Sequence, residues 1–280
     1  MKKRILITGS SGFVGRQVLN YLTTKDINIT VIVRNSDQKM YENSINVDNI
    51  ITTLDLFSES AEWWKNVLKG VDTLIHVAWY TEVGYYLHSS KNLDCLQGTI
   101  NMAKGASEAG VRRLVGVGTC FEYDLSKGLC SIETPLKPLT IYASAKASAY
   151  NILSQWLPKQ KVEFAWCRLF YLYGEGEDIQ RLAPYLRSKL TKGEVAELSS
   201  GDKIRDFMDV RQAGILIASV ALASASGPIN ICSGKPITIR EFAENIADEY
   251  GRRDLLKFST RKEEIFNPPM VVGKKNFIKI

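Results

Sequence analysis

A glycine-rich turn directly after the first apolar run constrains the fold of this chain most. The sequence "RILITGSSGFVG" places Gly9, Gly12 and Gly15 three residues apart, between a β-branched run and a segment with helical periodicity. Glycines at a strand-to-helix turn allow a tight bend and a close approach to a phosphate, and the following helix N-terminus offers free N–H groups and a positive dipole end. The turn therefore predicts a nucleotide-binding βαβ unit at the start of the chain.

Short β-branched runs continue to alternate with amphipathic segments over the first two-thirds of the sequence. The runs include "NITVIVR", "NIITTLD", "DTLIHVAW", "RRLVGVGT" and "EFAWCRLFYLYG", and two of the intervening helices are expected at residues 93–109 and 142–157. Repeated strand, crossover helix and strand form a parallel sheet that is covered on both faces. The predicted fold class is therefore α/β, a Rossmann-like doubly wound parallel sheet.

After Gly174 this alternation ends, and the pattern predicts a smaller mixed α/β C-terminal lobe. Helices are expected at residues 179–192, 210–223 and 239–250, with short strand-like runs between them. We expect residues 1–174 to form a nucleotide-binding Rossmann domain and residues 175–280 to form a smaller lobe that shares a cleft with it. Residues 210–232 are a candidate for returning to the first domain. Neither a Pro/Ser-rich linker nor a repeat marks the boundary.

Composition excludes several classes of function. The chain has 280 residues, of which 45% are hydrophobic, so it can bury a substantial core. Its 36 basic and 30 acidic residues form no dense basic block, so no nucleic-acid partner is expected. No apolar run approaches the length of a membrane span, and a cytoplasmic protein is expected. The five cysteines include no C-x-x-C pair, so neither disulfides nor a metal site is predicted.

Tyr142 and Lys146 stand four residues apart in "IYASAKASAY". One helical turn places both side chains on one face, and an adjacent ammonium lowers the pKa of a phenol, which makes the phenol a better proton donor or acceptor near neutral pH. Thr119 ends an expected strand 23 positions earlier, where its hydroxyl can bond a substrate carbonyl oxygen. The three residues predict a hydride-transfer site, and a solvated helix face is the alternative for the Tyr-Lys spacing.

The end of the second strand bears on the choice of cofactor. A carboxylate there bonds the adenosine ribose and repels a 2′-phosphate, but this chain has Arg34 in "VIVRNSD". Arg34 favours NADP(H), and NAD(H) stays open because Asp37 lies close in the sequence. Asp55 and Leu56, after the third strand, are expected near the adenine, with ordinary loop chemistry as the alternative.

In chain order, "TGSSGFVG", Asp55-Leu56, "HVAW", Thr119 with "YASAK", "RLFYLYG" and "GDKIRDFMDV" resemble the extended short-chain dehydrogenase/reductase family (NAD-dependent epimerase/dehydratase family) of nucleotide-sugar enzymes. The resemblance spans nearly the whole chain. It implies a catalytic triad of Thr119, Tyr142 and Lys146, and a homodimer packed through the helices at 93–109 and 142–157. The cofactor contacts that it implies are Gly9, Ser11, Gly12, Phe13, Val14, Gly15, Arg34, Asp55, Leu56, Ala78, Tyr142 and Lys146.

The resemblance also implies a pocket for a nucleotide-diphosphate sugar under the C-terminal lobe. Arg205 would pair with the pyrophosphate, or else form a surface salt bridge with Asp206 or Asp209. Glu122 stands where the family usually has an apolar residue, and is either a contact to a sugar hydroxyl or an exposed loop carboxylate. His88 either borders the sugar or is a packed or surface residue, while Arg168 is expected to stabilise its strand end. The implied substrate contacts are Thr119, Cys120, Glu122, Tyr171, Arg205 and His88.

Departures from the family pattern narrow the reaction. Cys120 and Phe121 stand where dehydrating members carry an Asp-Glu pair, which argues against a 4,6-dehydratase. Members that epimerise C3 and C5 use a cysteine and a histidine as acid and base. Cys120 lies one position away from that cysteine, and His88 is the only histidine after Leu87, which argues against this reaction as well. The favoured function is NADPH-dependent reduction of a nucleotide-activated 4-keto-6-deoxyhexose, in deoxysugar biosynthesis for bacterial surface polysaccharide. The alternatives are a redox-neutral NAD-dependent 4-epimerase and a non-catalytic NADP-binding scaffold or sensor.

Overall fold

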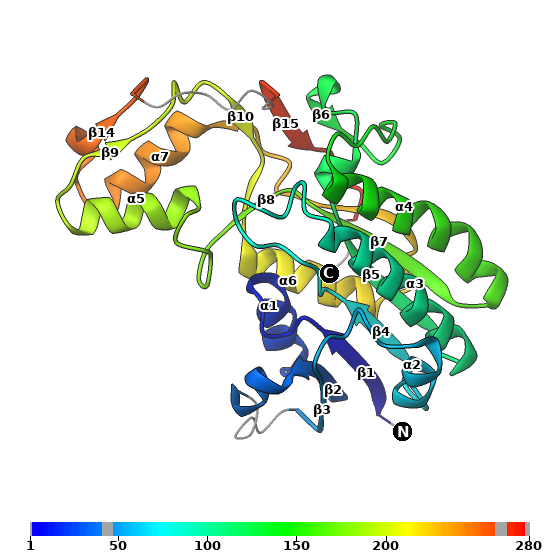
Figure 1. Ribbon diagram of the computed structural model, residues 1–280. Coiled ribbons are helices and arrows are strands. Elements are labelled where there is room, and N and C mark those ends of the chain that lie inside the picture. Colours follow the sequence, from blue (N-terminus) through cyan, green and yellow to red (C-terminus); the bar gives the residue numbers. More distant parts are fainter. Residues whose placement is uncertain (1, 41–46, 261–267, 278–280) are drawn as a thin grey trace.

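The computed structural model describes residues 2–40, 47–260 and 268–277, and its centre is a seven-stranded parallel sheet (Figure 1). The spatial order of the strands is β3-β2-β1-β4-β5-β7-β12, so the direction of winding reverses between β1 and β4. Ligands of such sheets bind at the carboxyl ends of the strands near this reversal. The doubly wound α/β prediction is confirmed. The strands are β1 (Lys3–Thr8), β2 (Ile27–Arg34), β3 (Asn49–Thr53), β4 (Thr73–His76), β5 (Arg113–Thr119), β7 (Glu163–Leu169) and β12 (Gly227–Ile231).

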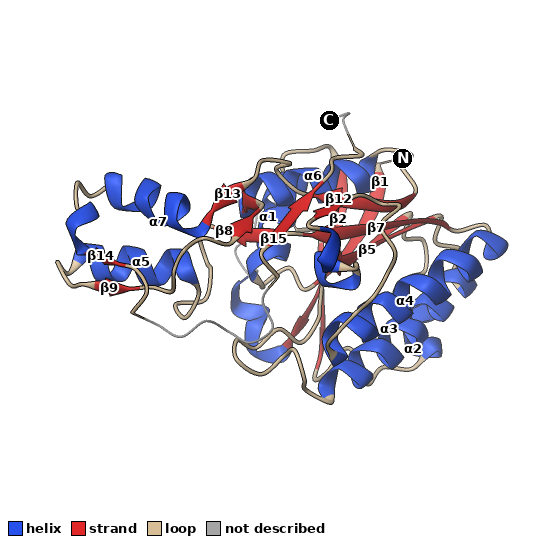
Figure 2. Ribbon diagram, turned by 90° about the horizontal axis from the view of Figure 1, so that it is seen from above, coloured by secondary structure: helices blue, strands red, loops and turns tan. Residues whose placement is uncertain are grey.

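Helices cover both faces of this sheet, because its central strands are apolar on both sides. Helices α1 (Phe13–Leu22) and α6 (Val210–Leu222) pack on one face, and Val18, Ile217 and Ile75 belong to the core between them and the strands. The other face is covered by α2 (Ala61–Val67), α3 (Lys91–Glu108) and α4 (Ile141–Trp156), which lie side by side in Figure 2. Residues 210–231, which form α6 and β12, therefore belong to the central sheet and its covering helices rather than to the C-terminal lobe.

The C-terminal lobe lies to one side of the sheet and has its own apolar core (Figures 1 and 2). Its main helices are α5 (Leu182–Thr191) and α7 (Ile239–Asp248), and Leu186 and Phe242 pack in the core between them. Helix α5 begins three residues later than the sequence pattern predicts, because residues 174–181 form turns. None of the described helices carries an apolar stretch long enough to cross a bilayer.

Short strands connect this lobe to the central sheet. A four-stranded sheet in the order β13-β10-β15-β6 joins segments that are far apart in the sequence, and β8 pairs with β11 in parallel. The short strands are β6 (Leu129–Cys130), β8 (Tyr171–Tyr173), β9 (Ala196–Glu197), β10 (Ile204–Arg205), β11 (Phe207–Asp209), β13 (Ile237–Thr238), β14 (Leu256–Lys257) and β15 (Met270–Gly273). The 3₁₀ turns are η1 (Asn35–Met40), η2 (Cys120–Glu122), η3 (Leu125–Lys127), η4 (Leu157–Gln160) and η5 (Arg253–Leu255).

Candidate active site

The turn between β1 and α1 has the shape of a phosphate cradle. Gly9 adopts a φ of +73°, and a Cβ atom there would lie 2.6 Å from the backbone nitrogen of Ala78. A Cβ on Gly15 would lie 2.0 Å from the carbonyl oxygen of Gly9, so neither position accepts a side chain. Gly12 precedes the first turn of α1, and no side chain caps that turn. The free N–H groups and this close-packed backbone fit the pyrophosphate of a dinucleotide.

Tyr142 and Thr119 meet at the carboxyl end of β5. Tyr142 lies in the first turn of α4 and is 9% exposed, and its phenol is within hydrogen-bonding reach of the Thr119 hydroxyl. The ring of Tyr86 packs edge-on against the Tyr142 ring, with 4.9 Å between centroids. Burial raises the pKa of Tyr142, the negative charge of Glu122 adds to that increase, and the hydrogen bond with Thr119 opposes it.

Lys146 is buried one turn along the same helix, as the spacing predicts. Its ammonium donates to the carbonyl oxygen of Val117 at 2.6 Å and lies 3.8 Å from the centroid of the Trp79 ring. Burial lowers the pKa of Lys146 to about 7, although the negative charge of Glu122 favours the ammonium. The expectation that Lys146 lowers the pKa of the Tyr142 phenol is therefore wrong. Burial dominates for both groups, and the ammonium is directed at Val117.

Two residues that sequence reasoning missed shape the loop beside this pair. The Trp79 indole donates to Asn92 at 2.9 Å, and the buried Asn92 amide donates to the carbonyl oxygens of Tyr86 and Ser89. These bonds hold the segment that brings Tyr86 against Tyr142. In the sequence, the tryptophan of "HVAW" is the one feature that could have pointed to these contacts.

The expected adenosine contacts lie around the glycine-rich turn. The Arg34 side chain is 70% exposed and pairs with Asp37 at 3.2 Å. Asp37 also accepts a hydrogen bond from the Ser11 hydroxyl at 3.1 Å, which places a carboxylate against the turn itself. Asp55 is exposed after β3 and Leu56 is half-buried beside it. The structure therefore presents both an arginine and a carboxylate beside the glycine-rich turn.

Arg205 is buried in β10 rather than placed on the surface. Its guanidinium donates to the carbonyl oxygen of Ile204 at 2.7 Å and lies 5.2 Å from the centroid of the Tyr171 ring. Asp206 accepts bonds from backbone N–H groups, and Asp209 pairs with an arginine of α6. The alternative of a surface salt bridge between Arg205 and these carboxylates is therefore wrong.

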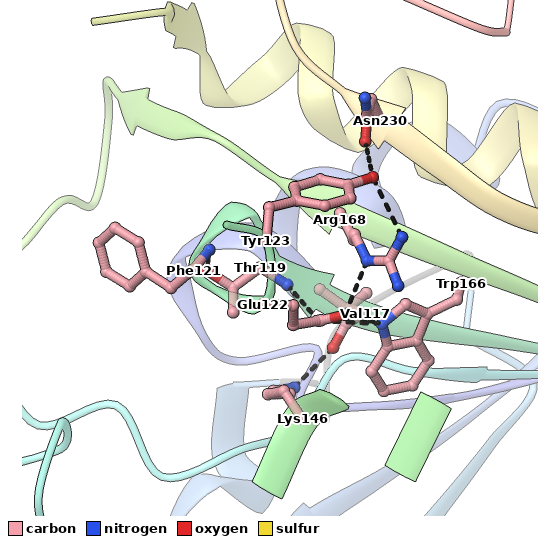
Figure 3. Close-up of polar contacts among 9 residues, drawn as sticks. All are labelled: Val117, Thr119, Phe121, Glu122, Tyr123, Lys146, Trp166, Arg168 and Asn230. Atoms are coloured by element: carbon pink, nitrogen blue, oxygen red, sulfur yellow. Dashed lines mark hydrogen bonds and ion pairs between the residues drawn. The ribbon is translucent and has the colours of Figure 1, made fainter. Parts of the chain in front are cut away.

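Glu122 contradicts both expectations for it. Its side chain is fully buried, and the carboxylate pairs with Arg168 at 2.7 Å and accepts hydrogen bonds from the Trp166 indole and the Thr119 N–H group (Figure 3). The exposed-carboxylate interpretation is wrong, and so is direct contact with a sugar hydroxyl, because protein donors occupy both oxygens. Arg168 has the structural position expected of it. A single sequence does not reveal that β7 places these donors beneath η2.

The remaining predicted substrate residues differ in burial. Cys120 is 2% exposed and burial raises the pKa of its thiol, while the Phe121 ring contacts Tyr171 edge-on at 6.1 Å. The two positions after Thr119 thus carry no carboxylate. His88 is exposed in the irregular segment before α3, and its role in sugar binding stays a prediction. Among the residues that the structure describes, no group of three or more His, Cys, Asp or Glu could hold a metal ion.

Comparisons with known proteins agree with this geometry. A sequence model described as the NAD dependent epimerase/dehydratase family matches residues 5–232. The chain is 25% identical to a protein named dTDP-6-deoxy-L-talose 4-dehydrogenase (NAD(+)) from Aggregatibacter actinomycetemcomitans, over 97% of this chain and 99% of that protein. It is 23% identical to a putative UDP-glucose 4-epimerase from Methanocaldococcus jannaschii, over 94% of this chain and 88% of that protein.

Solved structures show the same fold at lower sequence identity. UDP-N-acetylglucosamine 4-epimerase from Methanobrevibacter ruminantium, in complex with UDP-N-acetylmuramic acid, matches with a TM-score of 0.84 and 21% identity, covering 98% of this chain and 90% of that chain. A double mutant of dTDP-glucose 4,6-dehydratase from Streptomyces venezuelae, with NAD bound, matches with a TM-score of 0.80 and 20% identity, covering 97% and 88%.

Proposed function

The chain belongs to the NAD-dependent epimerase/dehydratase family, and we propose that it reduces a nucleotide-activated 4-keto-6-deoxyhexose to the 6-deoxyhexose. As a member of this family it is an NAD(P)-dependent enzyme. The observation that carries the proposal is the placement of Tyr142, buried at the start of α4, within hydrogen-bonding reach of Thr119, with Cys120 and Phe121 instead of carboxylates at the next two positions. Such a site can move a proton at the C4 oxygen but lacks the acid and base that dehydration needs. The name of the relative from A. actinomycetemcomitans describes redox chemistry at C4 of a 6-deoxyhexose.

The proposed proton donor is Tyr142. The buried phenol keeps its proton at neutral pH, and it gives that proton to the C4 oxygen as negative charge develops there. The Thr119 hydroxyl donates a hydrogen bond to the same oxygen, and the Lys146 side chain forms a hydrogen bond with the ribose of the cofactor. The bound nicotinamide supplies the hydride. The depth of Tyr142 and Thr119 keeps water away, which strengthens these hydrogen bonds.

The proposed cofactor site runs along the carboxyl ends of β1, β2 and β4. Gly9, Gly12 and Gly15 offer their backbone to the pyrophosphate, as their close packing allows. The other proposed contacts are Ser11, Phe13, Val14, Arg34, Asp55, Leu56, Ala78, Tyr142 and Lys146. The Arg34 side chain is 70% exposed, so it can exchange its ion pair with Asp37 for a contact with a 2′-phosphate, which supports NADP(H) as the preferred cofactor.

Residues 175–280, apart from those that join the central sheet, form the proposed substrate lobe. Arg205 at its base is the proposed partner of the substrate pyrophosphate, and Tyr171 lies against it. Cys120 and His88 are the further proposed substrate contacts. This lobe gives the nucleotide a binding surface that is separate from the cofactor turn.

A second candidate is a redox-neutral nucleotide-sugar 4-epimerase that retains NAD. The contact between Asp37 and Ser11 favours it, because a carboxylate at the glycine-rich turn suits the ribose hydroxyls of NAD and repels a 2′-phosphate. The same Thr119 and Tyr142 pair would serve the epimerase, so the outcome depends on whether the cofactor is released after one reduction.

One assay separates these candidates. The purified protein is given the 4-keto-6-deoxyhexoses of dTDP, CDP, UDP and GDP with NADPH or NADH, and UDP-hexoses without added cofactor, and products are identified by NMR. Oxidation of one reduced cofactor per sugar supports the reductase. Interconversion of C4 epimers without cofactor consumption supports the epimerase. Tight cofactor binding without turnover of any sugar would identify a scaffold or sensor and overturn both.

We also propose that the protein is a homodimer packed through α3 and α4. These helices are neighbours on one face of the sheet (Figure 2). They carry the exposed apolar side chains Leu93, Ile141 and Ile152. Pairing two copies would bury these side chains in a four-helix bundle. Sedimentation that shows only monomer at micromolar concentration would contradict this arrangement.

A further inference from the structure

A buried polar network surrounds Glu122 at the carboxyl end of β5 (Figure 3). One carboxylate oxygen accepts bonds from the Thr119 N–H group at 2.8 Å and from the Trp166 indole at 3.0 Å. The other oxygen accepts from Arg168 at 2.7 Å and from the same indole at 3.1 Å. Three donors from β5 and β7 thus converge on one carboxylate that is closed to solvent.

The network is anchored on its far side. Arg168 also donates to the Tyr123 hydroxyl at 3.0 Å, and that hydroxyl donates to Asn230 at 2.7 Å. Asn230 belongs to β12, and its amide group donates to two backbone carbonyl oxygens. The carboxylate of Glu122 is therefore fixed from β7 and β12, two strands that carry none of the proposed catalytic residues.

Two glycines of β5 make room for this arrangement. A Cβ atom on Gly118 would lie 2.3 Å from the Glu122 carboxylate and 2.2 Å from the Trp166 indole nitrogen. A Cβ on Gly116 would lie 2.4 Å from the ring of Trp166. Glycine weakens the interior of a strand, so its use here at alternate positions allows close approach of the indole and the carboxylate to the backbone.

The network reaches the proposed catalytic pair through Thr119. Glu122 fixes the Thr119 N–H group, while the Thr119 hydroxyl accepts from the Phe121 N–H group at 3.3 Å and is within hydrogen-bonding reach of Tyr142. Two residues earlier on β5, the carbonyl oxygen of Val117 accepts from Lys146. The strand end that carries the hydroxyl is thus held on one side by Glu122 and on the other by α4.

We propose that Glu122, held by Arg168 and Trp166, is a positioning residue that orients Thr119 toward Tyr142 and the reacting oxygen. The inference rests on the proposed function, which assigns Thr119 and Tyr142 their roles. Stability alone is a weak explanation for the pair, because a buried ion pair recovers little more than its desolvation cost. The Nη2 amino group of Arg168 is buried without a hydrogen-bond partner in the described part of the chain, which adds to that cost.

The test compares Glu122→Gln, Thr119→Val and the double variant with wild type. Gln has one carbonyl acceptor for three donors, so the Thr119 backbone loses its fixed partner. Glu122→Gln should lower kcat for the 4-keto sugar about 10- to 100-fold, the scale of a small misplacement in a catalytic site, with little change in the dissociation constant of the cofactor. The double variant should be no slower than Thr119→Val, because both changes remove the same interaction.

A spectroscopic measurement makes the test independent of turnover. The protein is produced with tyrosine that carries a carbon isotope label at Cζ, and its NMR spectrum is recorded. The Tyr142 signal is the one that disappears in Tyr142→Phe. Glu122→Gln should shift the Tyr142 signal in the same direction as Thr119→Val. If no sugar is turned over, the proposed function fails but this shift still supports the positioning role. An unchanged Tyr142 signal in Glu122→Gln would overturn it.

A folding defect is separated from a positioning defect by two further variants. Glu122→Leu combined with Arg168→Met replaces the pair by apolar side chains, a change that often preserves or raises stability. This double variant should have a melting temperature close to that of wild type, and its kcat should remain low. Recovery of wild-type kcat would show that the pair is only structural. Glu163→Gln, which removes an ion pair from the opposite end of β5 and β7, should leave both kcat and the Tyr142 signal unchanged.

Discussion

One arginine–carboxylate pair lies at each end of strands β5 and β7, and the two pairs differ in burial. At the amino end, Arg113 meets Glu163 at 2.6 Å, and the Glu163 side chain is 58% exposed. At the carboxyl end, Arg168 meets Glu122 at 2.7 Å, and neither side chain is more than 1% exposed. The contact distances are almost equal, so the difference lies in solvent and in the neighbouring groups.

These neighbours give the pairs different consequences. Arg113 also donates to the carbonyl oxygens of Val220 and Ala225, and so fastens the end of α6 to the sheet. Water screens the charge of Glu163, and little of its field reaches other groups. Glu122 is unscreened and its charge acts on both Tyr142 and Lys146. The comparison indicates that burial determines whether an ion pair only fastens elements or also sets the electrostatics of a site.

Tyr142→Phe should have the largest effect, and it acts at the carboxyl end only. The substitution keeps the ring packing against Tyr86 but removes the proposed proton donor, so kcat should fall roughly 10²- to 10⁴-fold. Cofactor affinity should hardly change, which fluorescence titration with NADPH and NADH would measure. Near-normal reduction of every 4-keto sugar that wild type accepts would show that Tyr142 is not the donor.

Lys146→Met tests how far burial lowers the pKa of the lysine at this end of the sheet. Lys146 has a pKa of about 7 in the folded protein against 10.5 in the unfolded chain. Between these values the unfolded chain binds a proton that the folded protein lacks, so the free energy of unfolding of wild type rises with pH. Lys146→Met removes this dependence. The variant should be more stable than wild type by on the order of a few kcal/mol. This difference in the free energy of unfolding should be largest near pH 7 and below, and it should shrink toward pH 10.

The other groups around Lys146 do not obscure this effect. Burial lowers the pKa of His76 to about 3 and raises that of Cys95 to about 11, and the pKa of Tyr142 is also raised, so all three stay neutral between about pH 7 and 10. Glu122 is the charged residue that faces Lys146, and it is present in both proteins. Chemical denaturation at several pH values gives the difference directly. A constant stability difference across this range would show that Lys146 keeps an ordinary pKa.

Sequence reasoning reached the fold and the proposed catalytic residues, because both follow from local patterns. The turn at Gly9 and Gly15 is specified by close backbone contacts, and the parallel strands by apolar runs. Helical spacing put Tyr142 and Lys146 on one face, and the resemblance in motif order gave them their proposed roles. Such features depend on residues that are near one another in the sequence.

The properties that sequence reasoning did not reach depend on pairing across the sheet. Glu122 was expected to contact a sugar hydroxyl or to lie in an exposed loop, because its partners, Trp166 and Arg168, lie more than forty positions later, on β7. The direction of the Lys146 ammonium likewise depends on where β5 places the carbonyl oxygen of Val117. Asn92 was missed because its bond to Trp79 forms only when the loop closes between β4 and α3. Register between distant elements, rather than local propensity, decides these contacts.

Arg34→Ala examines a third, exposed pair, which resembles the amino-end pair in its solvation. If Arg34 bonds the 2′-phosphate, its removal should raise the dissociation constant of NADPH about tenfold or more, the value of one charge-assisted hydrogen bond, and leave that of NADH nearly unchanged. Asp37→Asn is the matched variant, since it removes the carboxylate that pairs with Arg34 and should strengthen NADPH binding. Equal changes for both cofactors in either variant would show that this pair does not select between them.

Glu163→Gln should have the smallest effect and closes the comparison between the two strand ends. Its carboxylate is more than half exposed and makes one ion pair, and Arg113 keeps its two carbonyl partners when that pair is lost. The free energy of unfolding should therefore fall by only about 0–1 kcal/mol, and less at high salt, because water and ions screen an exposed charge. Urea denaturation at low and high salt measures both values. A loss of several kcal/mol, independent of salt, would mean that Glu163 acts as a buried charge, and exposure would then not be what separates it from Glu122.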